Sequence, residues 1–122
     1  MHEVSVDHGR RLVDVRLAGF FSPQTASVAA EEVRAAIGSL GNVPGEHVTL
    51  YDVSEVQIAP GPTIELLQET FRNPAYRHLL AKRVAFVTPS ALARLQLQRV
   101  RQDREDIAIF DKRGAALDWL LA

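Results

Sequence analysis

The sequence predicts an α/β fold with a single-layer mixed, mainly parallel sheet, an N-terminal β-hairpin and flanking helices. Three observations support this prediction. Two segments that alternate apolar and polar residues, 3–7 and 11–17, are joined by a turn at His8-Gly9, as in a hairpin. Three short apolar runs have the length and composition of buried strands: 48–53, 83–88 and 107–110. Helical segments separate these runs, and strands that alternate with helices require parallel crossovers.

Helix start and stop signals define the segments between the strands. Ser22-Pro23 pairs an N-cap hydroxyl with a proline at the first helical position, and Ala26, Val33 and Ile37 follow at helical spacing. The other expected helices are listed by their ranges: 62–73 after the corner at 60–62, a short turn at 75–81, 90–102 after Pro89, and 114–121.

Composition excludes several classes of protein. At 122 residues the chain has the size of one domain, 1–122, and it has no cysteine for disulfides, thiol catalysis or thiolate metal sites. The formal net charge of −1 gives no electrostatic reason to expect nucleic acid as a partner. No apolar run approaches the ~20 residues of a membrane span, and no apolar stretch of a secretion signal follows the N-terminus. We therefore expect a cytoplasmic protein.

Three strings carry a family resemblance: VTLYDVSEVQIAPGPTIELL, KRVAFVTPSALARLQLQRV and IAIFDKRGAALDWLLA. Together with the order of elements they resemble the anti-sigma factor antagonist fold, the STAS or SpoIIAA-like superfamily. The last two strings look closest to a small bacterial STAS/Sec14-like branch of uncharacterised proteins. The resemblance covers nearly the whole chain in topology. It implies the fold, whereas a shared fold does not carry a function with it.

In the phospho-switch members that the chain resembles, an Asp-Ser pair follows the central strand, and the serine is phosphorylated at a helix N-terminus. The resemblance places Asp52 on the strand-end aspartate and Pro60 and Gly61 on the Asp-Ser pair. Neither residue can accept a phosphoryl group. Pro62 removes one more N–H, and Thr63 is the nearest hydroxyl. We therefore expect that the phosphoacceptor of this family is absent.

No arrangement of residues predicts catalysis or a bound metal. Ser22, Ser54 and Ser90 follow strands but lie in no nucleophile elbow, and Ser22 and Ser90 are better explained as N-caps. The four histidines lack the spacing of zinc ligands and are expected to be exposed or locally bonded. Asp52 and Asp111 are the only catalytic carboxylates that we can nominate. Asp52 is better explained as accepting backbone N–H bonds from 54–56. We expect no cofactor and no enzyme.

Two surfaces remain as candidates for binding. Ligands of open α/β sheets bind beyond the carboxyl ends of the strands, and a helix N-terminus at Ser90 could hold an anion there. The residues expected at this edge are Ser54, Gly61, Thr88, Ser90, Asp111 and Lys112.

The second surface is the helix at 90–102, whose apolar arc is wider than a surface helix needs. One flank holds Leu92 and Leu95. The other flank and the adjacent polar stripe form the candidate partner surface: Ala93, Leu97, Val100, Arg94 and Arg101. An alternative is that this helix packs against the terminal helix and Trp119, sealed by arginine stems.

These observations favour a non-enzymatic STAS-like interaction domain that binds a protein partner, with a homodimer expected. The alternative is a domain that binds a small apolar or lipid-like ligand, as the Sec14-like label of the branch implies. The sequence does not identify the partner or the ligand.

Overall fold

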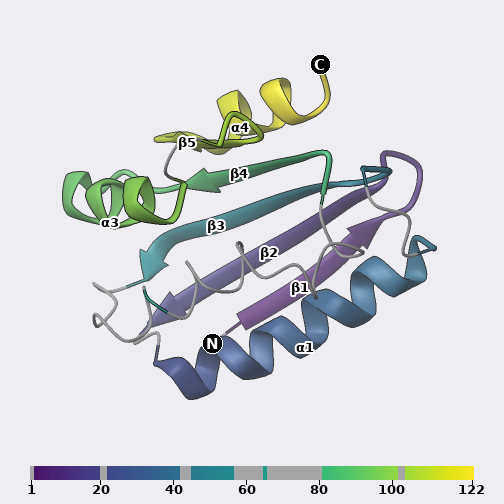
Figure 1. Ribbon diagram of the computed structural model, residues 1–122, viewed down its shortest axis with the longest axis horizontal. Coiled ribbons are helices and arrows are strands. Elements are labelled where there is room, and N and C mark those ends of the chain that lie inside the picture. Colours follow the sequence, from purple (N-terminus) through teal and green to yellow (C-terminus); the bar gives the residue numbers. More distant parts are fainter. Residues whose placement is uncertain (1, 20–21, 42–44, 57–64, 66–80, 102–103) are drawn as a thin grey trace.

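One mixed five-stranded sheet forms the centre of the computed structural model, which describes residues 2–19, 22–41, 45–56, 65, 81–101 and 104–122 (Figure 1). The strands are β1 (His2–Asp7), β2 (Leu12–Gly19), β3 (Val48–Val56), β4 (Arg83–Val87) and β5 (Ile107–Phe110). The helices in the described part of the chain are α1 (Pro23–Ser39), α3 (Ala91–Arg101) and α4 (Arg113–Leu120).

The strands lie in chain order, β1-β2-β3-β4-β5. β1 and β2 pair antiparallel as a hairpin, with Val4 opposite Val15, and the other three pairings are parallel. The predicted fold class, with its N-terminal hairpin and mainly parallel sheet, is therefore confirmed.

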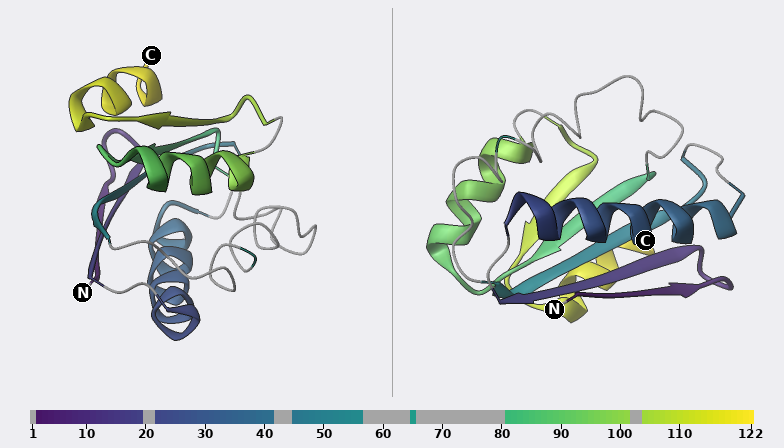
Figure 2. Two further views of the ribbon diagram at one scale, coloured as in Figure 1. Left: turned by 90° about the vertical axis from the view of Figure 1, so that its left-hand side faces the viewer. Right: turned by 90° about the horizontal axis from the view of Figure 1, so that it is seen from below.

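The helices divide between the two faces of the sheet. Right-handed crossovers between parallel strands that advance in one direction place their helices on the same face. α1, between β2 and β3, and α3, between β4 and β5, lie together on one face (Figure 2). α4 follows the last strand and is free of this constraint, and it covers the opposite face over β3, β4 and β5. None of the helices in the described residues has the length and hydropathy to cross a membrane.

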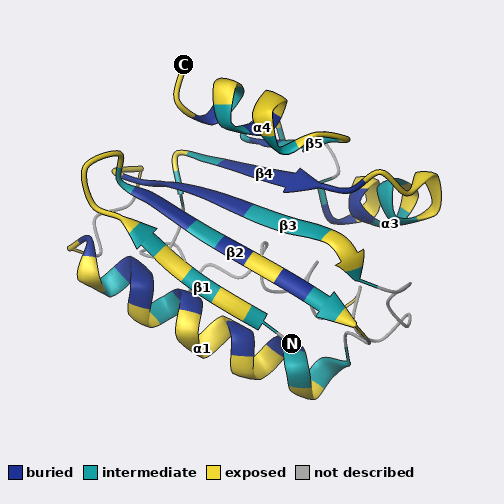
Figure 3. Ribbon diagram, turned by 180° about the vertical axis from the view of Figure 1, so that it is seen from behind, coloured by how far each residue is buried: buried dark blue, intermediate teal, exposed yellow. Residues whose placement is uncertain are grey.

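Alternation along the strands fills the apolar layers on both faces. On the α1 side, Val13, Val15 and Leu17 of β2 pack with the inner positions of α1, from Ala26 to Leu40. On the α3 side of the same face, the buried residues are Val84, Phe86, Leu97 and Ile107. Under α4 they are Leu12, Val48, Leu50, Ala85, Val87, Ala116 and Leu120. Because β4 is covered on both faces, Val84 to Val87 are all buried (Figure 3).

The N-terminus of α1 has the predicted cap. The hydroxyl of Ser22 accepts a hydrogen bond from the backbone N–H of Thr25 at 3.2 Å, and Pro23 is the first residue of the helix. This arrangement satisfies one of the free N–H groups of the first turn. The corner at 60–62 and the helical segments predicted at 62–73 and 75–81 lie outside the described residues, apart from Glu65 and from Ala81, which is not helical.

β3 is longer than the predicted strand 48–53. It continues to Val56 because β2 also extends, so that Gly19 pairs with Val56. Between these ends the register shifts: Arg16 pairs with Asp52, but Ala18 pairs with Glu55. This irregularity adds one residue to β3 and changes its local hydrogen bonding.

The face under α4 is only partly covered. α4 has eight residues and contacts β3, β4 and β5, so the same face of β1 and β2 carries polar side chains. Glu3, Ser5, Asp7 and Arg16 are exposed there, and Asp14 is half-buried at the margin of α4. Exposed and more buried positions alternate along β1 in Figure 3.

Candidate functional site

The hydroxyls at the end of β4 serve local structure. Thr88 is buried, and its Oγ1 accepts a hydrogen bond from the backbone N–H of Ser90 at 3.2 Å. The hydroxyl of Ser90 in turn accepts one from the backbone N–H of Ala93 at 3.2 Å, which confirms the predicted N-cap. Both acceptors are therefore engaged at the N-terminus of α3.

The other residues predicted at the carboxyl edge are arranged differently. Ser54 lies within β3 and is exposed, because the strand extends beyond the predicted end. Asp111 and Lys112 follow β5 and are both exposed. Lys112 is the N-cap residue of α4 but forms no side-chain cap, while its carbonyl accepts from the N–H of Ala116. Gly61 lies outside the described residues.

The candidate partner surface on α3 needs correction. Leu97 and Val100 are buried and face the sheet, so neither is available to a partner. Both residues are buried because their flank of α3 packs against the sheet, where Leu97 forms a cluster with Phe86 and Ile107. The other flank, with Leu92 and Leu95, is exposed.

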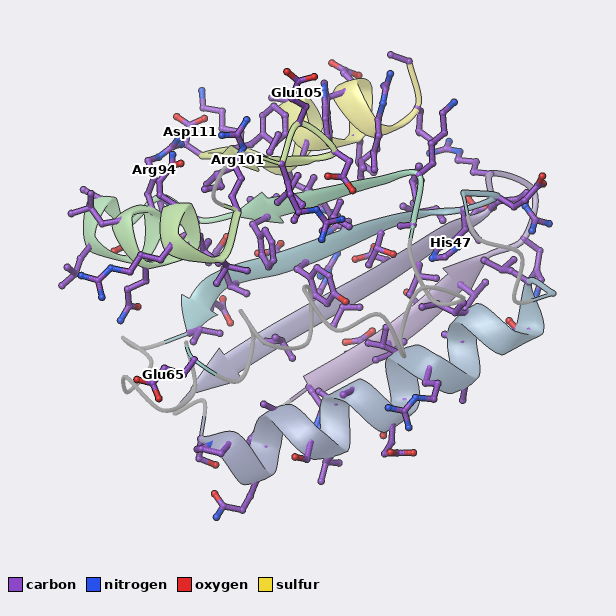
Figure 4. The ribbon with its side chains drawn as sticks, viewed as in Figure 1. His47, Glu65, Arg94, Arg101, Glu105 and Asp111 are labelled. Carbon is purple, nitrogen blue, oxygen red and sulfur yellow. The ribbon has the colours of Figure 1, made fainter. Side chains whose placement is uncertain are left out.

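Arg94 and Arg101 also point toward the body of the protein. The Nε of Arg101 donates to the backbone carbonyl of Ile107 at 2.6 Å, and Nη1 of Arg94 donates to that of Ile109 at 3.4 Å. Figure 4 shows both side chains between α3 and β5. The fifth predicted surface residue, Ala93, is half-buried.

A charged cluster joins three elements on the α4 side of the sheet. Arg113, the first residue of α4, forms ion pairs with Asp14 of β2 and Asp52 of β3, the latter at 3.4 Å. The second oxygen of Asp52 accepts the backbone N–H of Ser54 at 3.1 Å. The predicted use of Asp52 as an acceptor for a nearby backbone N–H is thus confirmed. The side chain of Asp14 is only 18% exposed, and its Oδ1 has no hydrogen-bond partner.

The electrostatics of this Asp14–Arg113–Asp52 cluster are those of a structural clamp. Burial lowers the pKa of Arg113, but the hydrogen bond and charge of Asp14, aided by Asp52, outweigh it and raise that pKa overall. A cation at the first position of a helix is disfavoured by the helix dipole. The two carboxylates offset this effect and fasten the start of α4 to β2 and β3.

Sequence reasoning did not single out Asp14 or Arg113. Asp14 occupies a polar position in an alternating strand, where the expected environment is solvent. Arg113 is 99 residues away, in the first turn of the last helix. The sequence holds one indirect signal. Asp14 lies in the middle of a predicted strand, and a carboxylate that becomes buried there requires a partner cation. Among the described residues, no three histidine, aspartate or glutamate side chains gather where they could hold a metal ion.

His47 departs from the expectation that the histidines are exposed or locally bonded. It immediately precedes β3, is 3% exposed, and its Nε2 has no hydrogen-bond partner. Arg11 lies nearby with a positive φ of 53°, and its guanidinium donates to the carbonyls of Leu40 and Glu46. Burial, followed by the positive charge of Arg11, lowers the pKa of His47 below its usual 6.5.

We expect His47 to make the fold less stable as the pH falls below about 6.5. Above that pH the ring is neutral in the folded and in the unfolded protein, so it does not change the free energy of unfolding with pH. Below it the unfolded chain takes up a proton that the folded protein resists, so the free energy of unfolding decreases. Urea unfolding of the wild type and His47→Gln between pH 5 and 8 measures the effect, as the difference between the two pH profiles.

The control for His47 is His8→Gln, which replaces an exposed histidine in the β1–β2 turn. Its pH profile should follow that of the wild type. A His47→Gln profile parallel to the wild type would contradict a buried, neutral His47.

Comparison with solved structures identifies the fold. The chain is similar to the crystal structure of an uncharacterized protein from the DUF3478 family, with a SpoIIAA-like fold, from Shewanella loihica PV-4. The TM-score is 0.71 at 16% sequence identity, over 98% of this chain and 93% of that chain. No protein-family model matches the sequence, and no curated protein matches it. The fold is therefore SpoIIAA-like, which confirms the architecture that the resemblance implied.

Proposed function

We propose that this chain is a non-enzymatic interaction domain that forms a homodimer through the outer flank of α3. The observation that carries this proposal is the pair of exposed leucines, Leu92 and Leu95, which lie one helical turn apart. Leu95 is 64% exposed, and no other large apolar side chain in the described residues is more exposed. Exposed apolar side chains that adjoin one another on a surface mark candidate sites of association.

The charged groups support a non-enzymatic role. The two carboxylates and the guanidinium that the structure brings together, at Asp14, Arg113 and Asp52, are bonded to one another and to backbone. Asp111, the other nominated carboxylate, is exposed at the start of the connection to α4. A catalytic pair needs two titratable groups that converge on a reacting atom, and these carboxylates instead hold a helix in place.

The predicted absence of the phosphoacceptor also supports this function. In the phospho-switch proteins that the chain resembles, a serine after the central strand changes the charge of a binding surface. Here Pro60 and Gly61 occupy the corresponding positions in the sequence. A domain of this kind would associate without the phosphorylation that those phospho-switch proteins use.

A second copy of the chain is the partner to which the proposal commits. A two-fold axis that passes near Leu95 places the same leucines opposite each other, so a small apolar strip is self-complementary. The strip spans a single turn, and an interface of this size corresponds to a weak, concentration-dependent dimer.

The average mass should rise with protein concentration from the 13.5 kDa of one chain toward twice that value. Leu95→Glu places a charge at the centre of the strip and should shift the protein to monomer. Light scattering and native mass spectrometry measure both states. Native mass spectrometry would also reveal the retained mass that the apolar-ligand alternative requires.

Val28→Glu is the matched control, because Val28 is 53% exposed and lies on α1, away from the strip. It should leave the dimer unchanged. A monomeric wild type, or equal effects of Val28→Glu and Leu95→Glu, would overturn the proposal.

A further inference from the structure

β5 is an edge strand of the sheet, and its hydrogen bonds to β4 show which of its carbonyls face outward. The N–H of Val84 donates to the carbonyl of Asp106 at 2.8 Å, and the N–H of Thr88 donates to that of Phe110 at 2.9 Å. In a parallel pair the carbonyls that face the neighbour alternate along the strand. The carbonyls of Ile107 and Ile109 therefore point away from β4, toward the free edge.

Both outward carbonyls are occupied by arginines of α3. Arg101 bonds to Ile107 through Nε, and Arg94 bonds to Ile109 through Nη1. The arginines are two helical turns apart and the carbonyls two strand residues apart, and α3 runs antiparallel to β5. The long side chains converge to bridge the difference in spacing.

The two edge strands, β1 and β5, differ in whether their own residues hinder pairing with another chain. β1 carries exposed charges at Glu3 and Asp7, and charged side chains hinder the pairing of an edge strand with another chain. β5 reads Ile-Ala-Ile-Phe, with no charge and no proline. Short uncharged segments rich in β-branched and aromatic residues are those that pair with copies of themselves. An edge of this kind depends on cover from another element.

We propose that Arg94 and Arg101 act as an edge block, which prevents β5 from pairing with β5 of a second copy of the chain. Pairing of two such strands would be antiparallel about a two-fold axis and would join two sheets into one. Each guanidinium takes a carbonyl that the incoming strand needs. The block thus directs association away from β5, and it is independent of the interface proposed at Leu92 and Leu95.

The test uses Arg94→Met/Arg101→Met in a Leu95→Glu background, so that the outer flank of α3 contributes no association. Methionine keeps much of the apolar stem and removes the guanidinium. The double variant should show a higher mass than the Leu95→Glu protein by sedimentation at equal concentration.

A fluorescent peptide with the sequence of residues 106–111 provides a second readout. It should bind the variant at least about tenfold more tightly than it binds the Leu95→Glu protein, the factor that the loss of one competing charged hydrogen bond represents.

The control is Gln98→Ala in the same background, which alters an exposed position of the same helix. It should change neither the mass nor peptide binding. Circular dichroism shows whether the double variant folds. If it does not, Arg94→Met alone, which removes the longer bond, is compared with the Leu95→Glu protein by the same two readouts. A folded variant with unchanged mass and unchanged peptide binding overturns the proposal, whether or not the wild type dimerises through α3.

Discussion

Replacement of Arg113 by methionine is expected to lower the free energy of unfolding by about 2 kcal/mol. The change leaves Asp14 and Asp52 on the same side of the sheet without the cation that bridges them. Loss of one partner from a fully buried ion pair costs about 3–5 kcal/mol, and the partial exposure of these side chains reduces that figure. Urea unfolding followed by the fluorescence of Trp119, the only tryptophan, measures the change.

Two controls separate a clamp from a general effect of charge. Arg16→Met removes an exposed arginine on the same face of β2 and should cost less than about 0.5 kcal/mol. Asp14→Leu combined with Arg113→Met should be more stable than Arg113→Met alone, since it removes the carboxylate left without a partner. If Arg113→Met costs no more than Arg16→Met, the cluster does not hold α4.

Replacement of Leu97 by alanine is expected to destabilise the protein by about 2–4 kcal/mol. Leu97 is 6% exposed and packs with Val84, Phe86 and Ile107, so truncation leaves a cavity between α3 and the sheet. The same unfolding experiment measures the loss.

Leu95→Ala is the matched comparison, because it makes the same chemical change two residues away on the exposed flank. It should alter the stability of the monomer by less than about 0.5 kcal/mol. The two variants also distinguish the flank that binds a partner from the flank that packs in the core. Substitution at Leu95 should change the mass of the assembly, and substitution at Leu97 should change the free energy of unfolding. Equal losses of stability at both positions would contradict the assignment of Leu97 to the core.

Much of the architecture followed from local patterns. Alternation at Val4 and Val6 and at Val13 and Val15 predicted the hairpin, because the strand period of two places those residues on one face. The hydroxyls of Ser22 and Ser90 predicted two helix starts, because a cap depends on bonds within three residues. Order and type of element were predictable wherever the determining interaction is local.

The end of β3 was not predictable in the same way. The apolar run ends at Val53, and Glu55 in the segment 54–56 has low strand preference, so the sequence predicts that the strand ends before this segment. Pairing with Ala18 and Gly19 of β2 extends it by three residues. A partner strand across the sheet thus overrides the local preference.

The candidate site depended still more on tertiary structure. Asp52 was nominated from its place after a buried strand, but its bond to Arg113 joins residues 61 positions apart. The apolar arc of α3 was visible in the sequence, yet its two flanks had similar composition. Only the packing of Leu97 against the sheet identifies which flank is free.

The sequence by itself determined the α/β class, the hairpin and the helix caps, because each depends on residue identity or on contacts a few residues apart. Only the tertiary structure decided that Arg94 and Arg101 cover the edge of β5, that Arg113 joins Asp14 to Asp52, and that Leu92 and Leu95 face outward. Each of these depends on how α3 and α4 dock on the sheet. Docking is set by long-range packing, which leaves no periodic signal in a single chain.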